Sequence, residues 1–105
     1  DPYDLQTTRN TIKEELSNDG PSVVISQRAC VLFKRAHTKP QKPLRIDPGK
    51  CKGCKVCLGL GCPPISWKKM EKKEGSKQEG ISQIDENLCN GCGLCLQVCK
   101  FNAIN

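Results

Sequence analysis

An α+β chain in two unequal parts is predicted by three features of this sequence of 105 residues. Eight of the nine cysteines lie in two runs, one starting at Cys51 and the other at Cys89. The residues around the two runs repeat each other at an offset of 38 positions. The first 43 residues contain one cysteine and instead have the patterns of a helix, a strand and a second helix. We therefore expect a partial α/β segment over residues 1–43, followed over residues 44–105 by a module of short helices and short antiparallel strand pairs.

The composition indicates too few apolar side chains for an ordinary core. Hydrophobic residues make up 36% and aromatic residues 4% of the sequence, and a chain of this size buries only about two-thirds of its unfolded surface. Coordinate or covalent bonds at the cysteines are expected to replace part of the core. No stretch has the roughly 18 apolar residues of a membrane span and none reads as a signal peptide, so we expect a cytoplasmic chain with no membrane partner. The start at Asp1, without an initiator Met, suggests a piece of a longer protein.

The cysteine spacing is typical of iron–sulfur clusters. The first run reads Cys51-x2-Cys54-x2-Cys57-x4-Cys62-Pro63, and the second reads Cys89-x2-Cys92-x2-Cys95-x3-Cys99. A disulfide framework would need an export signal and would leave one of nine thiols over. Structural zinc needs only two C-x2-C pairs, whereas each run here has a third cysteine at the same spacing. The favoured interpretation is two [4Fe–4S] clusters, whose bacterial signature is C-x2-C-x2-C-x3-C-P.

In this signature the fourth cysteine of each run binds the cluster of the other run. The rule predicts that cluster I is held by Cys51, Cys54, Cys57 and Cys99. It predicts that cluster II is held by Cys62, Cys89, Cys92 and Cys95. Glycines between the cysteines would let the backbone curve tightly and aim N–H groups at sulfur: Gly53, Gly91 and Gly93. Neighbouring apolar side chains would shield the clusters from water: Val56, Leu58, Leu94, Leu96 and Val98.

The internal repeat predicts the strands of this module. Each half reads as a short strand, a cysteine loop, a one-turn helix and another short strand. Residues 65–67 should pair antiparallel with residues 81–84, around a charged hairpin tip from Lys68 to Gly80. Residues 45–46 should pair with residues 103–104. This pseudo-twofold arrangement is that of a bacterial two-[4Fe–4S] ferredoxin.

The sequence departs from the bacterial motif at two places. The first run has four residues instead of three before Cys62, and Lys100 follows the second run where proline is usual. Neither change removes a ligand, although both can alter hydrogen bonding to sulfur.

The first 43 residues are predicted to be the tail of an α/β domain that lies upstream. A helix from Thr7 or Thr8 to Asn18 is indicated by the apolar spacing, with Thr11-x-x-Glu14 as a capping box and Gly20-Pro21 after its end. Val23-Val24-Ile25 predicts a buried strand, residues 28–36 a second helix, and residues 38–43 a linker. A single strand of this kind has no neighbour in this chain to pack against.

Taken together, these segments resemble the C-terminal end of the large (alpha) subunit of the indolepyruvate ferredoxin oxidoreductases, in the thiamine-diphosphate-dependent 2-oxoacid:ferredoxin oxidoreductase superfamily. Four stretches carry the resemblance, which covers nearly the whole chain. They are Asp1-Pro2-Tyr3-Asp4-Leu5, Gly20-Pro21-Ser22-Val23-Val24-Ile25-Ser26 with Arg28 and Cys30, Cys62-Pro63, and Ile65-Ser66-Trp67. The four-residue gap before Cys62 is typical of this family.

The resemblance implies an electron-transfer module of an enzyme that converts an aryl pyruvate and coenzyme A to an aryl acetyl-CoA and CO2. Thiamine diphosphate and Mg²⁺ would be bound by the parent enzyme upstream and not by this fragment, in which no catalytic residue is assigned. The two clusters would pass the electrons to an external ferredoxin. The implied partners are the upstream thiamine-binding domain, the smaller (beta) subunit and that ferredoxin, in an anaerobic cytoplasm. The alternative is a free-standing two-cluster ferredoxin with an N-terminal extension.

Positive charge near the cysteines is consistent with an acidic ferredoxin as partner. The formal net charge is +6, which two clusters would lower to about +2. Six lysines lie near the runs: Lys50, Lys52, Lys55, Lys68, Lys69 and Lys100. They form either a landing patch for the partner or a solvated face that offsets the cluster charge. Interleaved acidic residues and the lack of an aromatic stacking set argue against a nucleic-acid partner.

Three other residues are given structural roles or none. Cys30 has no neighbouring cysteine, so we expect a buried free thiol and not a ninth ligand. His37 is expected to be an exposed loop residue without a role. Trp67 is expected to pack against the cysteine-rich module.

Overall fold

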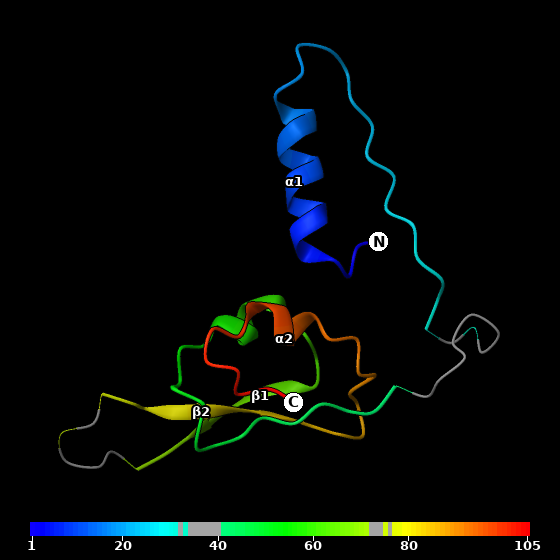
Figure 1. The fold of residues 1–105 in the computed structure, drawn as a ribbon. Coiled ribbons are helices and arrows are strands. Elements are labelled where there is room, and N and C mark those ends of the chain that lie inside the picture. The colour runs from blue at the N-terminus through cyan, green and yellow to red at the C-terminus, as the bar shows by residue number, and fades with distance from the viewer. Residues whose placement is uncertain (32, 34–40, 72–74, 76) are drawn as a thin grey trace. The chain divides into compact units, whose positions relative to one another are not determined.

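The computed structural model describes residues 1–31, 33, 41–71, 75 and 77–105 of the chain. It separates into two compact units, Asp1–Pro40 and Gln41–Asn105 (Figure 1). Helix α1 belongs to the first unit, and the short elements η2, β1, β2 and α2 follow in the second. Among the described residues, no helix is both long enough and apolar enough to cross a membrane.

The first unit is built on helix α1, Leu5–Leu16. The predicted helix is confirmed, but it begins earlier than expected because Asp4 is its N-cap. The Thr7 N–H donates to Asp4 Oδ1 at 3.0 Å and the Thr7 hydroxyl donates to Asp4 Oδ2 at 2.8 Å. These two bonds lower the pKa of the Asp4 carboxyl, the backbone bond contributing most. The expected capping box at Thr11 is wrong, since Thr11 lies inside the helix.

The strand expected after α1 is not found, and the described residues of the expected second helix are not helical. Val23, Val24 and Ile25 lie in irregular backbone and are 84%, 48% and 82% exposed. A strand needs a paired neighbour for its backbone groups, and the described residues of this unit supply none. Arg28–Val31 is not helical either, and the Phe33 N–H donates to the Cys30 carbonyl at 2.9 Å in a turn there. Residues 32 and 34–36 of that predicted helix, His37 and residues 38–40 of the linker lie outside the described residues.

Arg28 instead ties the chain after α1 back to its start. Its guanidinium donates to Asp1 Oδ2 at 2.6 Å and lies 3.9 Å from the centroid of the Tyr3 ring. Both partners are partly exposed, so the ion pair alone contributes little to stability. The contact does join two of the stretches on which the family resemblance depends.

The second unit is centred on the hairpin of β1, Ile65–Lys69, and β2, Gly80–Ile84. The strands are antiparallel, with Ile65 opposite Ile84 and Lys69 opposite Gly80, which confirms the predicted pair. Both strands extend further toward the tip than expected. The second expected pair is also confirmed, as a bridge between Ile46 and Ile104 with reciprocal backbone bonds of 2.7 and 3.0 Å between Arg45 and Asn105.

One short helix follows each cysteine loop. The 3₁₀ helix η2 covers Val56–Leu60 and contains Cys57, and α2 covers Leu94–Val98 and contains Cys95. Their first residues are 38 positions apart, as in the sequence repeat. Figure 1 shows both helices on the same side of the β1–β2 hairpin.

The core of the second unit is small and contains sulfur. Its buried hydrophobic residues are Ile65, Cys95, Ala103 and Ile104. Three more cysteines are partly buried around this group, together with Leu44, Ile46, Leu58 and Ile84. Val56 and Leu96, which were expected to shield the cysteines, are 45% and 41% exposed. Apolar packing alone is therefore sparse, as the composition indicates.

Candidate metal centre

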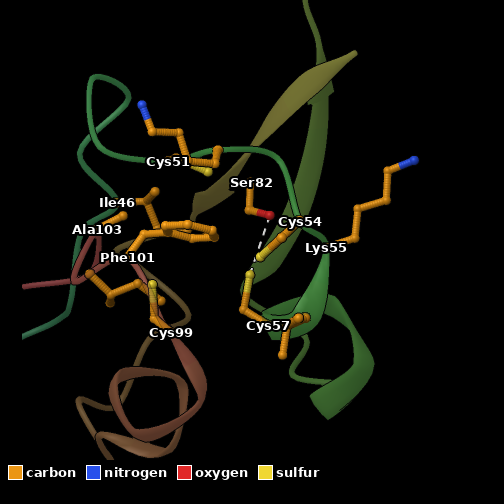
Figure 2. Close-up of a pocket in the computed structure, with 12 residues that line it drawn as sticks. Ile46, Cys51, Cys54, Lys55, Cys57, Ser82, Cys99, Phe101 and Ala103 are labelled. Carbon is orange, nitrogen blue, oxygen red and sulfur yellow. Dashed lines mark hydrogen bonds between the residues drawn. The ribbon is translucent and has the colours of Figure 1, made fainter. Parts of the chain in front are cut away.

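The structure places four cysteines around a first pocket of about 350 Å³. They are Cys51, Cys54, Cys57 and Cys99, and Figure 2 shows them with other residues of the lining. Three come from the loop and helix before β1, whereas Cys99 ends α2 in the other half of the repeat. Eight other residues complete the lining of the pocket: Ile46, Lys52, Lys55, Val56, Ser82, Phe101, Ala103 and Ile104.

The other four cysteines line a second pocket of about 330 Å³. They are Cys62, Cys89, Cys92 and Cys95. Here three thiols come from the second run and Cys62 comes from the first. The remaining lining is mostly apolar: Leu44, Leu60, Pro64, Ile65, Ile84 and Asn90. Each pocket thus collects the same four side chains that the spacing rule groups together, while their binding of iron stays a prediction.

The four cysteine side chains of each pocket fit a [4Fe–4S] cluster, which is a cube of iron and sulfide, better than a single metal ion. No three His, Cys, Asp or Glu side chains in the described part of the chain converge closely enough to hold one metal ion. In a [4Fe–4S] cluster each thiolate binds a different iron, so the four sulfur atoms stand further apart than four ligands of one zinc ion. Four soft thiolates around one pocket are the ligands that such a cluster requires.

The backbone of the two cysteine loops follows the same path. Gly53 and Gly91 have φ of 68° and 70°, and the residues two positions later, Lys55 and Gly93, have φ of 61° and 80°. These left-handed positions curve each loop around its pocket. At the second pocket the N–H groups of Gly91 and Leu44 both lie 3.4 Å from Cys89 Sγ. Such N–H donors stabilise a thiolate that binds metal.

The thiols of the second pocket are close enough to affect one another's ionisation. Burial, and then the neighbouring Cys92 and Cys89, raise the pKa of the Cys95 thiol to about 11. Burial and the same two neighbours also raise the pKa of Cys62. Without metal, these thiols therefore stay protonated at neutral pH, and iron must displace their protons to bind.

In the iron-free folded chain, alkylation of Cys95 by iodoacetamide should reach half its maximal rate near pH 11. In the same chain unfolded by urea, the midpoint should fall to the ordinary value of about 9. The rate follows the thiolate fraction, because the thiolate is the nucleophile. Since folding favours the protonated form, the iron-free chain should lose stability as the pH rises from about 9 to about 11. Peptide mass spectrometry across pH gives both midpoints, and equal midpoints would contradict the burial of Cys95.

Two residues of the first pocket were missed by the sequence reasoning. Ser82 lies on β2, is 2% exposed and accepts a hydrogen bond from the Cys57 thiol at 3.3 Å. Phe101 is 44% exposed and lines the same pocket. The alternation of buried and exposed residues along β2 could have placed Ser82 on the inner face, on the same side as Ile84. Nothing in the spacing of the sequence points to Phe101.

Lysines are distributed unequally between the pockets. Lys52 and Lys55 line the first pocket, and no lysine lines the second one in the part of the chain that the structure describes. Lys55 Nζ lies 3.6 Å from Glu79 Oε2 and 4.7 Å from the centroid of the Trp67 ring. Figure 2 shows the Lys55 side chain extending away from the cysteines. The expected packing of Trp67 on the cysteine-rich module is confirmed, since its ring also lies against Gly53 and Gly80.

Cys30 is not part of the lining given by the structure for either pocket. Its expected burial is wrong, however, because the residue is exposed. The described residues on either side of Cys30 are not helical.

Comparison with known proteins agrees with the cysteine chemistry. A family model described as a 4Fe-4S binding domain matches residues 82–105. A chain of the solved formate dehydrogenase, heterodisulfide reductase and formylmethanofuran dehydrogenase complex from Methanospirillum hungatei is 30% identical. The match covers 59% of the present chain and 95% of that chain, with a TM-score of 0.47.

Curated relatives match almost the whole chain. The indolepyruvate oxidoreductase subunit IorA of Pyrococcus horikoshii is 41% identical over 98% of the chain, and that of Pyrococcus abyssi is 39% identical over the same share. The subunit of Methanothermobacter marburgensis is 33% identical, also over 98%. The chain spans only 15% of the length of each of these relatives. The protein belongs to the family of the indolepyruvate oxidoreductase subunit IorA, of which it matches one segment, and it contains a 4Fe-4S binding domain.

Proposed function

We propose that residues 44–105 bind two [4Fe–4S] clusters in a pseudo-twofold ferredoxin-like module. The observation that carries the proposal is the presence of two pockets with four cysteines each, three from one run and the fourth from the other. The matching left-handed residues of the two loops support the pseudo-twofold arrangement. The clusters, when bound, supply one-electron transfer. The chain holds them through eight thiolates.

The module is proposed to relay electrons in an indolepyruvate:ferredoxin oxidoreductase. The proposal rests on the similarity to IorA subunits, whose name refers to an indolepyruvate oxidoreductase. The parent enzyme would release the electrons by oxidative decarboxylation of an aryl pyruvate at thiamine diphosphate and Mg²⁺, with transfer of the acyl group to coenzyme A. No residue of this chain is proposed to take part in that chemistry. A free-standing ferredoxin is disfavoured because residues 1–43 match the same relatives as the cysteine module.

Residues 1–43 are proposed to belong to an α/β domain of the parent subunit. Helix α1 has no buried residue, and Val23, Val24 and Ile25 are all exposed in the described part of this unit. Apolar side chains of this kind need a partner surface, which an upstream thiamine-binding domain would supply. The smaller (beta) subunit and an external acidic ferredoxin are the other proposed partners, in a cytoplasmic enzyme. Exposed Lys52 and Lys55 beside the first pocket would attract such a ferredoxin.

Iron analysis and spectroscopy of the anaerobically purified chain test this proposal. We expect about eight irons and eight sulfides per chain, a brown colour with absorption near about 400 nm, and two one-electron couples in a redox titration. Zinc as the bound metal, or a colourless protein, would overturn it. About four irons per chain would retain a single cluster and overturn the two-cluster proposal.

A further inference from the structure

Ser82 is the only buried polar side chain in the described part of the chain, with 2% of its surface exposed. Its hydroxyl makes one hydrogen bond among the described residues, to the Cys57 thiol at 3.3 Å (Figure 2). A buried hydroxyl requires a partner, and here a sulfur atom of the first pocket fills that need. Ser82 is thus held against one of the proposed cluster ligands.

The second pocket has no hydroxyl at the matching position. The repeat offset of 38 places Leu44 where the other half has Ser82. Leu44 does lie at the second pocket, since it is part of the lining and its backbone N–H is 3.4 Å from Cys89 Sγ. Its side chain is apolar and has no proton to donate. The two pockets therefore differ by one side-chain donor at equivalent places in the repeat.

The direction of the Ser82 hydrogen bond must reverse when iron is bound. Cys57 is a thiol in this structure and donates to Ser82 Oγ. A thiolate bound to iron has no proton, so the serine hydroxyl becomes the donor and Cys57 Sγ the acceptor. Hydrogen bonds to a charged acceptor are stronger than neutral ones. Reduction adds one negative charge to a cluster, so this donor stabilises the reduced state more than the oxidised state.

Charge near the two pockets acts in the same direction. Lys52 and Lys55 lie at the first pocket, and the lining described for the second pocket has no basic residue. Both lysines are exposed, so water and salt screen their effect. Ser82 is buried, where a hydrogen bond is screened much less. The hydroxyl is therefore the contribution that a single substitution can isolate.

We propose that the Ser82 hydroxyl raises the reduction potential of the cluster in the first pocket by donating a hydrogen bond to Cys57 Sγ. This inference rests on the proposed function, since it requires a cluster in each pocket. Ser82 is a tuning residue in this scheme and contributes no ligand.

Ser82→Ala in the intact, cluster-loaded chain tests the inference through a potential. Redox titration followed by electron paramagnetic resonance should show that the midpoint potential of one couple is lowered by about 59 mV. For a one-electron couple this shift corresponds to a roughly tenfold smaller ratio of reduced to oxidised cluster. The other couple should stay in place. The couple is assigned with Cys99→Ala, which is expected to retain only the cluster of the second pocket. Ser66→Ala is the matched control, because Ser66 is an exposed serine on the neighbouring strand β1.

Leu44→Ser provides a second, independent variant. It introduces a hydroxyl at the second pocket and should raise the potential of that cluster by a similar factor. Full iron with both couples unchanged in Ser82→Ala would overturn the inference and leave the two-cluster function intact. If Ser82→Ala does not retain its iron, Leu44→Ser becomes the test. An unchanged potential of the cluster in the second pocket of that variant then overturns the inference. A wild-type chain without eight irons would instead refute the proposed function.

Discussion

Replacing Cys99 by alanine should remove the cluster of the first pocket and leave that of the second. Cys99 stands in the second run of the sequence, yet the structure places it with Cys51, Cys54 and Cys57. A cubane that loses one of four thiolate ligands loses an iron or fails to assemble. Iron per chain should therefore fall from about eight to about four. The result depends on the fourth cysteine of each run lying at the pocket of the other run. If each run bound its own cluster, Cys99→Ala would instead remove the cluster of the second run.

Alkylation mapping identifies which cluster remains. Thiols bound to iron react slowly, so in Cys99→Ala the three remaining cysteines of the first pocket should become labelled. The four cysteines of the second pocket should stay protected: Cys62, Cys89, Cys92 and Cys95. Cys62→Ala is the reciprocal variant and should give the opposite pattern, because Cys62 lines the second pocket. Cys30→Ala is the control, since this exposed residue lines neither pocket and all eight irons should be retained. Labelling of Cys89 and protection of Cys51 in Cys99→Ala would refute the crossed arrangement.

The cysteine-rich unit could be predicted well because its constraints are local and repeated. The spacing of eight cysteines groups the same side chains that the structure collects in each pocket. The repeat also predicts the antiparallel hairpin pair and the pairing of residues 45–46 with residues 103–104, which the structure forms through Ile46 and Ile104. The contact of Ser82 with Cys57 was not predicted, because a serine within a strand pattern does not indicate which residue its side chain contacts. Only the fold brings its hydroxyl within reach of Cys57.

The first unit was predicted less well because its apolar pattern needs partners outside it. Val23-Val24-Ile25 has the composition of a buried strand, but composition states only what a segment can do when a neighbouring strand is present. Without that neighbour the three residues are exposed and irregular. The start of α1 was misplaced for a different reason. Asp4 and Thr11 both precede residues that can be helical. The N-cap is the one whose side chain accepts from an N–H of the first helical turn, and in the structure this is Asp4.

Gly91→Ala should remove the cluster of the second pocket, although it changes no ligand. Gly91 has a φ of 70°, a conformation that costs a residue with a Cβ about 1–2 kcal/mol. A Cβ at this position would lie 2.4 Å from the carbonyl oxygen of Lys42. That oxygen belongs to backbone and cannot rotate away, so the segment before Leu44 must shift. The shift would move the Leu44 N–H away from Cys89 Sγ, which it now meets at 3.4 Å.

Gly53→Ala is the matching substitution for the first pocket. Gly53 has a φ of 68°, and a Cβ there would lie 2.5 Å from the carbonyl oxygen of Gly80. Gly80 and Lys42 are themselves 38 positions apart, so both loops pack one glycine beneath the equivalent backbone carbonyl. Gly59→Ala is the control, because its Cβ would meet no atom within 4 Å and its φ is not positive.

Each loop variant should lose about half of the iron, Gly91→Ala from the second pocket and Gly53→Ala from the first, as read by alkylation mapping. Gly59→Ala should keep all of it, since alanine is also favoured over glycine in a helix such as η2. Each glycine contacts a backbone carbonyl beside its own pocket only, so each substitution should remove only the cluster of that pocket. If both clusters disappear together in either variant, the pockets share one cooperative fold. If both clusters persist, the loops can move by more than the packing in this structure indicates, and the role assigned to the two glycines is wrong.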